Sequence, residues 1–543
     1  MIDQISRDSS SLKLGEVRRG FSYAELHCHS YFSLLDGASS PEALVARAQE
    51  IRLHSLALTD HHSLAGAIHF WRAAAKANLH AVIGAEVALT DGSHLTLLAE
   101  TQTGYADLCR LLTRARLDQV DDDAWSGKIE PQLSWDLLAE HTNGLIALTG
   151  CDRGPVAAAL GEKDDATACA NLTSLCEIFG PQQLFVELQN HFLPHQRVLN
   201  EAVLQIAFQV RLPVVATNNV HYATAQQSHL RDALIAMQHN LFLSAACKAG
   251  YLPVNNMAYL ASPAEMAQRF PFLPHALETS VEIAERCQVD LDFLGQRLPT
   301  FATPVLENGT RQSEFEYLYQ ICHANMPKRY PTLTPAVLKQ LAHELDVIER
   351  VGLAGYFLIV WDLVRFAREH GIRDQGRSSA ANSIVAYLLG ITSIDPLAHN
   401  LLFERFLSEE KFTTPDIDID FAADRREEVI QYIYAKYGRE HTGMVCNVVT
   451  YRARSALRDM AKALDFPTPV IDRLSKSVDA RDLAEAGEQL MVGLSVEGRS
   501  VERPHPNLPL LRDCYGTRDR AKFSPRSRSR DGSSPRLGEV RRG

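Results

Sequence analysis

Short apolar runs alternate with segments of helical periodicity through the first third of the chain. Strands are expected at residues 23–26, 55–58 and 82–83, each of which lies in a compact apolar run. A helix is expected to begin at Pro41 behind the capping residues Ser39 and Ser40, because apolar side chains recur there at helical spacing. Repeated strand-then-helix alternation predicts a barrel-like α/β domain with its site at the carboxyl ends of the strands.

A second pattern is the strict alternation of acidic and apolar side chains in residues 414–421, which read TPDIDIDF. Successive side chains of an extended strand point to opposite faces, so Asp416, Asp418 and Asp420 share one face. The isoleucines between them face the core. The sequence therefore predicts a strand that carries a stripe of carboxylates.

Neighbouring carboxylates repel one another unless a cation lies between them, and hard divalent ions such as Mg²⁺ prefer oxygen ligands. One interpretation of the stripe is a metal site for phosphoryl transfer, where two ions stabilise the attacking and leaving oxygens. A polar strand edge and a calcium-binding loop are the alternatives. An EF-hand is disfavoured, since Ile417 and Ile419 occupy positions where that loop places Asp, Asn or Gly.

Upstream of the stripe, a loop of small residues runs into an apolar segment. Residues 374–383 read DQGRSSAANS and precede the apolar residues 384–389. The backbone N–H groups and the positive dipole end of such a helix entry suit a phosphate chain. Any tight helix entry looks similar, so this loop gains weight only together with the stripe and with residues 402–406, LFERF.

These motifs, with residues 355–362 and 451–459, resemble the catalytic subunits of the bacterial C-family DNA polymerases. The likeness is greatest to the error-prone branch of the polymerase III alpha family, and it covers roughly residues 22–475. It implies a DNA-directed DNA polymerase, a nucleotidyltransferase of translesion and DNA repair type that works with two metal ions. Asp416 and Asp418 would then be two of three catalytic aspartates that hold Mg²⁺, whereas Asp420 is not a primary ligand.

The same resemblance implies that four residues contact the incoming triphosphate, namely Arg377, Ser378, Ser379 and Arg405. Ser378 stands where the family has a glycine, and a side chain there could crowd the triphosphate. The third catalytic aspartate of the family lies further downstream than the last residue of this chain. We therefore expect a truncated chain whose polymerase site is incomplete and inactive.

Imidazole and carboxylate side chains mark the ends of the N-terminal strands. His27 and His29 point the same way on a strand, His61 follows the next strand, and Glu86 follows the one after that. A single histidine is more often a surface or core residue than a ligand. Three histidines and a glutamate at successive strand ends are typical of a metal site.

This pattern resembles the PHP domain, the polymerase-and-histidinol-phosphatase module that precedes the polymerase in C-family enzymes. The resemblance implies Zn²⁺ or Mn²⁺ held at nine positions: His27, His29, Asp36, His61, Glu86, His94, Cys151, Asn219 and His221. Asp60 would orient His61 through its other ring nitrogen. Asn219 stands where the family usually has aspartate, so one metal position is expected to bind more weakly. Cys151 could instead be a small buried residue, and the site could be structural, phosphoesterase or proofreading in role.

Composition and charge add context. The 543 residues allow several domains, and no signal peptide or long apolar span is recognisable, which favours a cytoplasmic location away from membranes. The net charge of −11 argues against DNA binding through overall charge but allows a local basic channel. Residues 498–543 are the exception, with twelve Lys and Arg against five Asp and Glu.

The two ends of the chain share a sequence. Residues 530–543, RDGSSPRLGEVRRG, nearly repeat residues 7–20, RDSSSLKLGEVRRG. Two distant copies cannot form a solenoid. Our hypothesis is that both flanks are translated from non-native DNA, that a frameshift or insertion interrupts the gene after about Ser475, and that both flanks are disordered.

The expected fold class is α/β, with a distorted (β/α) barrel followed by an α+β partial palm with helical thumb-like elements. The expected parts are a leader at 1–21, the PHP domain at 22–240, a helical connection at 241–300, the partial palm and thumb at 301–480, and a tail at 481–543. Proline punctuation places the boundary near residue 300.

Three functions fit these residues. The first is the polymerase, whose family partners are template-primer DNA, nucleoside triphosphates, a sliding clamp and lesion-bypass accessory proteins, the last two doubtful for this chain. The second is a stand-alone metal-dependent phosphoesterase that uses only the PHP site, with a metal-activated water as nucleophile. The third is a non-catalytic remnant that binds DNA or a partner protein.

Overall fold

The computed structural model describes residues 22–117, 130–292, 299–307, 309–407, 415–445 and 448–478. These residues form two compact units. The N-terminal unit comprises the described residues up to 292 together with 450–478, and the second unit comprises those from 299 to 449. The leader at 1–21 and the tail at 481–543 lie outside the described residues.

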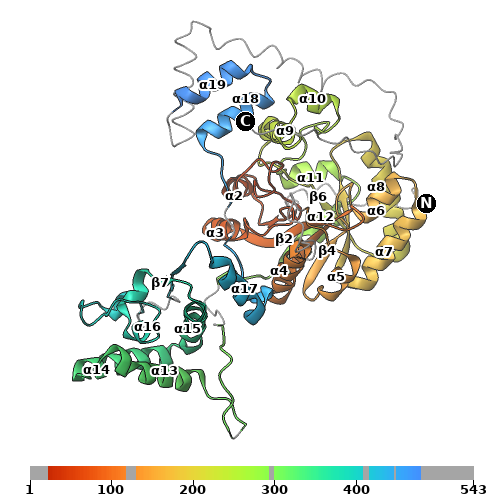
Figure 1. The fold of residues 1–543 in the computed structure, drawn as a ribbon. Coiled ribbons are helices and arrows are strands. Elements are labelled where there is room, and N and C mark those ends of the chain that lie inside the picture. Colours follow the sequence, from red (N-terminus) through yellow and green to blue (C-terminus); the bar gives the residue numbers. More distant parts are fainter. Residues whose placement is uncertain are drawn as a thin grey trace, which may run out of the picture. The chain divides into compact units, whose positions relative to one another are not determined.

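The N-terminal unit is built on a six-stranded mixed sheet in sequential order. Strands β2, β4 and β6 of this sheet are labelled in Figure 1. Its strands are β1 (Ser55–Leu58), β2 (His80–Ala88), β3 (His94–Ala99), β4 (Leu145–Leu148), β5 (Leu184–Gln189) and β6 (Val214–Thr217). The pairs β1–β2, β4–β5 and β5–β6 are parallel, whereas β3 is antiparallel to both neighbours. Strands β1, β3, β4 and β5 are buried along their whole length, which explains why most of their side chains are apolar.

The segment at residues 25–28 curls this sheet. Glu25 forms a parallel bridge with Leu56 in β1, at one edge, and Cys28 forms another with Val220, just after β6 at the opposite edge. Because the segment changes partner between these two residues, it forms isolated bridges where a continuous strand was expected. The prediction of an α/β domain based on a distorted barrel is confirmed.

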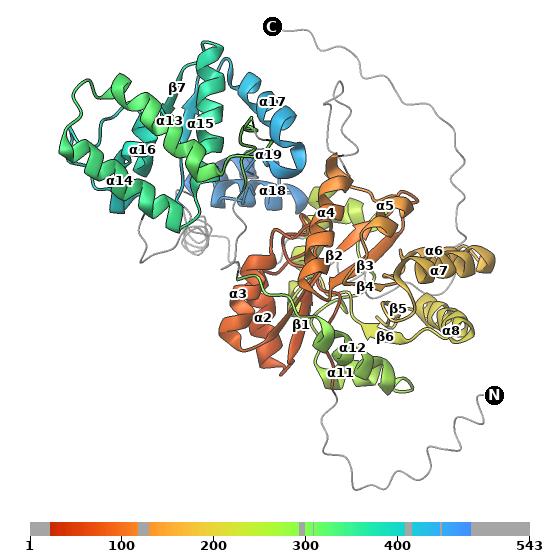
Figure 2. The ribbon, with the colours of Figure 1, turned by 90° about the horizontal axis from the view of Figure 1, so that it is seen from below.

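Helices cover this sheet, and Figure 2 shows α6, α7 and α8 gathered beside β4 and β5. The unit contains α2 (Pro41–Glu50), α3 (Ala67–Ala77), α4 (Gln102–Leu117), α5 (Trp135–Glu140), α6 (Pro155–Gly161), α7 (Asp165–Phe179), α8 (Pro194–Val210), α9 (Ser228–Gln238), α10 (Leu243–Lys248), α11 (Pro263–Arg269), α12 (Pro274–Arg286), α18 (Ala453–Ala463) and α19 (Thr468–Ser477). Helix α2 begins as expected, because the Ser40 hydroxyl accepts a hydrogen bond from the Ala43 amide at 3.1 Å. Helix α18 packs against α9.

The second unit is mainly helical, and two short strands that are distant in sequence pair within its described residues. It contains α13 (Glu314–Arg329), α14 (Pro335–Arg350), α15 (Ala354–Glu369), β7 (Asp374–Gly376), α16 (Ile384–Leu388), β8 (Ile419–Phe421) and α17 (Arg426–Tyr437). Strands β7 and β8 are antiparallel and pair Gly376 with Ile419. Its core is separate from that of the N-terminal unit and includes Phe357, Leu358 and Ile384. Within the described ranges, every helix is too short or too polar to cross a lipid bilayer.

A buried carboxylate ties α15 to α17 in this unit. Asp362 accepts hydrogen bonds from Lys436 at 2.5 Å, from Tyr432 at 2.7 Å and from Tyr437 at 2.9 Å. Arg365 donates to its other oxygen at 2.8 Å. Burial would raise the pKa of Asp362, but the hydrogen bonds from Lys436 and Arg365 outweigh it and lower that pKa.

Candidate functional site

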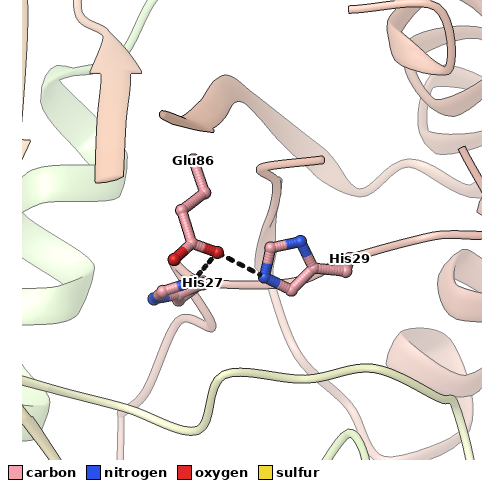
Figure 3. Close-up of side chains that lie close together, drawn as sticks. All are labelled: His27, His29 and Glu86. Atoms are coloured by element: carbon pink, nitrogen blue, oxygen red, sulfur yellow. Dashed lines mark hydrogen bonds and ion pairs between the residues drawn. The ribbon is translucent and has the colours of Figure 1, made fainter. Parts of the chain in front are cut away.

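The strand ends of the N-terminal unit bring the predicted metal ligands together. His27 lies in the segment at residues 25–28, His29 follows directly after it, and Glu86 lies in β2; both rings point toward the Glu86 carboxylate (Figure 3). The Nε2 atoms of His27 and His29 lie 3.4 and 3.2 Å from Glu86 Oε2. All three residues are buried, and one ligand atom from each fits within a 4.8 Å cluster.

Three more predicted ligands contact the same carboxylate. His61 Nδ1 lies 3.1 Å from Glu86 Oε2, and His94 Nδ1 lies 2.8 Å from Oε1. The Cys151 Sγ atom lies 3.7 Å from Oε1. Glu86 is thus the centre of a cluster of four imidazoles and one thiol, contributed by segments spread over more than 120 residues of sequence.

Asp36 forms the second centre of the site. Its Oδ2 atom lies 3.1 Å from His61 Nε2 and 3.1 Å from His221 Nδ1. His61 therefore connects the two carboxylates, with one ring nitrogen at each. Arg231 in α9 donates to Asp36 Oδ1 from Nε and Nη2, at 3.0 and 2.9 Å. The site thus has two adjoining carboxylate positions that share one imidazole.

Two residues of this site were not predicted. Glu187 in β5 lies 2.7 Å from His27 Nδ1, and Arg231 fixes Asp36. A charged residue inside the apolar strand LFVELQ was a signal that could have identified Glu187. Arg231 lies on an ordinary amphipathic helix, so its sequence position carries no comparable signal.

The expectation for Asp60 is wrong in its detail. Its carboxylate accepts hydrogen bonds from the Ser30 amide, the Ser30 hydroxyl and the Ser33 hydroxyl, each at 2.7 Å. Both ring nitrogens of His61 face other carboxylates. Asp60 instead fixes the turn that contains Ser33, whose hydroxyl accepts a hydrogen bond from the His61 amide at 3.1 Å.

Burial and close charges divide the histidines into two groups. Burial lowers the pKa of His27, but Glu187 and Glu86 outweigh it and raise that pKa to about 10. The same holds for His61: burial lowers its pKa, but the Glu86 and Asp36 carboxylates outweigh that effect and raise the pKa to about 10. Burial and the nearby His61 charge hold the pKa of His29 well below its usual value. For His221, burial and Arg231 lower the pKa to about 4.

The donor set fits a divalent metal ion. The Oδ1 atom of Asn219 is buried without a hydrogen bond. Buried polar atoms of this kind are costly unless a ligand satisfies them. Neutral imidazoles and carboxylates are ligands of Zn²⁺ and related ions. Asn219 has a φ of 43°, in the left-handed region that asparagine tolerates better than most residues.

The carboxylate stripe of the second unit has the expected alternation. Asp416, Asp418 and Asp420 are exposed, whereas Ile417 and Ile419 are half-buried and pack on the core of the unit. The strand itself is shorter than predicted. Only Ile419–Phe421 pairs with β7, residues 415–418 belong to no strand, and Thr414 lies outside the described residues.

The loop after β7 reaches this stripe. The Ser378 hydroxyl donates a hydrogen bond to Asp418 Oδ2 at 2.7 Å, and Arg377 Nε lies 2.7 Å from Asp420 Oδ2. Ser379 follows in the short 3-10 helix at residues 378–382. Arg405 is exposed at the end of another 3-10 turn, and among the described residues no hydrogen bond or ion pair joins it to Asp416 or Asp418.

The helix entry behind this loop does not offer its amides to a phosphate, contrary to the expectation. The Glu344 carboxylate accepts hydrogen bonds from the Ile384 amide at 3.0 Å and the Val385 amide at 3.2 Å. The Ser383 hydroxyl accepts from the Ala386 amide at 3.1 Å. The first turn of α16 is therefore already satisfied by a buried carboxylate and a cap.

Comparison with known proteins adds to this geometry. Residues 25–191 match the PHP domain, and residues 316–503 match the bacterial DNA polymerase III alpha NTPase domain. The second match continues past residue 475, where the likeness was expected to end.

Three curated relatives show the extent of the similarity. The chain is 40% identical over 469 residues to the error-prone DNA polymerase of Symbiobacterium thermophilum, which covers 84% of this chain and 42% of the relative. It is 40% identical over 509 residues to that of Mycobacterium bovis, covering 90% of this chain and 45% of the relative. It is 35% identical over 472 residues to DNA polymerase III subunit alpha of Treponema pallidum, covering 84% and 39%. The chain thus spans less than half the length of these relatives.

Proposed function

Because this chain carries a PHP domain and a bacterial DNA polymerase III alpha domain, and is related to error-prone DNA polymerases over most of its length, we propose that it contributes the nucleotide-binding half of a DNA-directed DNA polymerase. The proposed reaction of the whole enzyme is template-directed transfer of a nucleotide to a primer. Template-primer DNA and nucleoside triphosphates are the proposed partners.

The observation that carries this proposal is the exposed stripe of aspartates with an arginine-containing loop against it. Ile417 and Ile419 pack on the core and so fix which face the carboxylates occupy. The contacts from Arg377 and Ser378 hold the loop beside that face. Carboxylates next to cationic and hydroxyl donors form the type of surface that can bind a metal ion together with a triphosphate.

In this proposal each residue has a separate role. Asp416 and Asp418 hold Mg²⁺, which when bound would offset the negative charge of the triphosphate. Arg377 leaves Asp420 to pair with a phosphate, since both members of that ion pair are more than half exposed and such a pair is weak. Ser379 and Arg405 bind the outer phosphates.

The test is metal-dependent nucleotide binding by the full chain. A fluorescent deoxynucleoside triphosphate is titrated with and without Mg²⁺, followed by anisotropy. Binding is expected to require Mg²⁺ and to weaken at least about tenfold in Asp418→Asn, since a ligand charge is lost. Arg377→Ala is expected to weaken binding without changing its Mg²⁺ dependence.

Asp424→Asn is the matched control, because Asp424 is an exposed aspartate just beyond β8. It is expected to bind the nucleotide as the wild type does. Equal nucleotide affinity of the wild type and Asp418→Asn would contradict the proposed role of the stripe.

A second function rests on the N-terminal site. Its buried donors form two adjoining positions around Glu86 and Asp36, which is more than a structural site for one ion requires. We infer that this site holds Zn²⁺ or Mn²⁺ and hydrolyses phosphate esters. His27, His29, Glu86 and Asp36 would hold the metal, and Arg231 would keep Asp36 oriented.

Hydrolysis of a chromogenic phosphodiester, with Mn²⁺ or Zn²⁺ added, tests this second function. Activity is expected to disappear in His27→Ala and to persist in Asp418→Asn, because the two sites belong to different units. Hydrolysis that survives His27→Ala would assign the activity to another protein in the preparation or to another site.

A further inference from the structure

Ser378 has a strained backbone at the candidate palm site. Its φ is 59°, in the left-handed region that disfavours residues with a Cβ atom and that glycine adopts without strain. Gly376, two residues earlier, lies in a crowded position. A Cβ at Gly376 would lie 2.3 Å from the Ile391 carbonyl oxygen, so β7 passes too close to that segment for any side chain.

The strained residue contacts the candidate metal ligand directly. Its hydroxyl donates to Asp418 Oδ2 at 2.7 Å, which is the short distance of a charge-assisted hydrogen bond. The Arg377 amide also donates to the Asp418 carbonyl oxygen at 2.8 Å. The loop is thereby fixed to the backbone of Asp418 as well as to its side chain.

A role in shaping the turn alone does not explain why a serine occupies this left-handed position. A glycine would make the same turn without strain, and a serine whose hydroxyl faced solvent would gain nothing in return. Non-glycine residues in this region persist where the surroundings fix them, and they concentrate at functional sites. Here the gain is one hydrogen bond, and it goes to one oxygen of Asp418.

We propose that Ser378 is a positioning residue that orients the Asp418 carboxylate for the metal ion of the palm. Hydrogen bonds to a ligating carboxylate fix its rotamer and leave its remaining lone pairs directed at the metal. This inference rests on the proposed function, because it takes Asp418 as a metal ligand. It assigns Ser378 to the metal ligand, whereas the sequence had placed it against the triphosphate.

The experiment measures Mn²⁺ binding to the full chain by electron paramagnetic resonance of the free ion. Asp418→Asn defines the component of binding that belongs to the palm, separate from the N-terminal site. Ser378→Ala removes the hydroxyl and keeps the Cβ, whereas Ser378→Gly removes both. Ser393→Ala is the matched control, since the Ser393 hydroxyl donates to Gln375 Oε1 at 2.9 Å.

Both Ser378 variants are expected to lose about tenfold in Mn²⁺ affinity at the palm, as is usual when a partner of a ligating carboxylate is removed. Ser393→Ala is expected to bind as the wild type does. A purely structural role of Ser378 predicts a different order of Mn²⁺ affinities. Ser378→Gly would relieve the backbone strain and would then bind Mn²⁺ at least as tightly as the wild type. Thermal unfolding of each variant checks that it is folded.

Two results separate this inference from the proposed function. If Asp418→Asn loses a Mn²⁺ site while both Ser378 variants keep wild-type affinity, the positioning role of Ser378 is overturned and the palm metal site stands. If Asp418→Asn binds Mn²⁺ like the wild type, the palm holds no ion and the proposed function falls together with the inference.

Discussion

The two candidate metal sites of this chain are built in opposite ways. In the N-terminal unit, imidazoles and carboxylates from separate strand ends meet in a buried cluster around Glu86 and Asp36. In the second unit, three carboxylates from one short segment lie exposed, and one loop contacts two of them, Asp418 and Asp420. The first site is created by the fold of a whole unit, whereas the second is created by the alternation of a single strand.

This difference decides how each site is linked to folding. The buried carboxylate of Glu86 and the buried Asn219 Oδ1 atom, which has no hydrogen bond, are costly in free energy without a ligand, so metal binding and folding should be coupled in the N-terminal unit. Exposed aspartates remain hydrated. Without a metal ion, the palm site should therefore lower the unfolding free energy of the second unit only slightly. Stability of the second unit depends on other contacts, such as the buried Asp362 cluster.

The largest difference between the two units is expected in how much added Zn²⁺ stabilises each of them. At a free Zn²⁺ concentration of about 1,000 times its dissociation constant, the N-terminal unit should gain about 4 kcal/mol of unfolding free energy. The second unit should gain much less, because its oxygen ligands are exposed and suit Mg²⁺ better than Zn²⁺. Calorimetry of the full chain with Zn²⁺ or with a chelator measures both transitions.

Glu86→Gln is the control for this experiment. It removes the central carboxylate of the cluster and should abolish the Zn²⁺-dependent shift of the N-terminal transition. A Zn²⁺ shift of equal size in both units would contradict the contrast between a buried and an exposed site.

Asp362→Asn should produce the next largest effect, this time in the second unit. Asp362 is buried, whereas Lys436 and Arg365 are partly exposed, so the substitution mainly weakens hydrogen bonds between charged groups, at a cost of about 2 kcal/mol. The folded state lowers the pKa of Asp362 from the usual 3.8, so its contribution is present at neutral pH. That contribution is lost as pH falls below about 4 and through the folded pKa. Denaturant unfolding of both proteins at several pH values should show the difference shrinking toward acid.

Asp346→Asn is a matched control on a neighbouring helix. Asp346 pairs with Arg350 on α14 at 2.7 Å, and both side chains are more than half exposed. This substitution should cost less than about 1 kcal/mol. Equal losses in the two variants would mean that burial of Asp362 does not decide its contribution.

The same contrast explains what the sequence could predict. The Asp416 to Asp420 stripe and the capped start of α2 follow from local periodicity and spacing, and both were predicted. The structure brings eight of the nine predicted metal-site residues together around Glu86 and Asp36, and Asn219 follows β6 two residues before His221; their roles as ligands stay a prediction. The roles of Glu187, Arg231 and Glu344 depend on partners distant in sequence, which no local pattern encodes. For the same reason the length of β8 was overestimated, since strand pairing ends where β7 ends.

Glu187→Gln should weaken metal binding in the N-terminal unit by about 10- to 100-fold. Glu187 contacts the ring nitrogen of His27 that faces away from Glu86, and so it orients the imidazole. Competition with a fluorescent Zn²⁺ chelator measures the affinity. Glu201→Gln, which removes an exposed carboxylate paired with Arg197 on α8, should leave the affinity within twofold. Similar losses in both variants would indicate a general charge effect and no orientation of His27.

Asn219→Asp should have the smallest effect, and in the opposite direction. The Asn219 Oδ1 atom is buried without a hydrogen bond, so it already occupies a position where an oxygen ligand could act. A carboxylate there adds a negative charge with nearly the same shape, and aspartate also tolerates the left-handed backbone of this residue. Affinity for Mn²⁺ in the N-terminal unit should rise about tenfold, equivalent to about 1.4 kcal/mol.

Asn78→Asp makes the same change at another left-handed asparagine, at the end of α3, and should leave metal affinity unchanged. If Asn219→Asp binds Mn²⁺ no more tightly than the wild type, its oxygen does not face the ion, and the weaker metal position expected from the sequence does not exist.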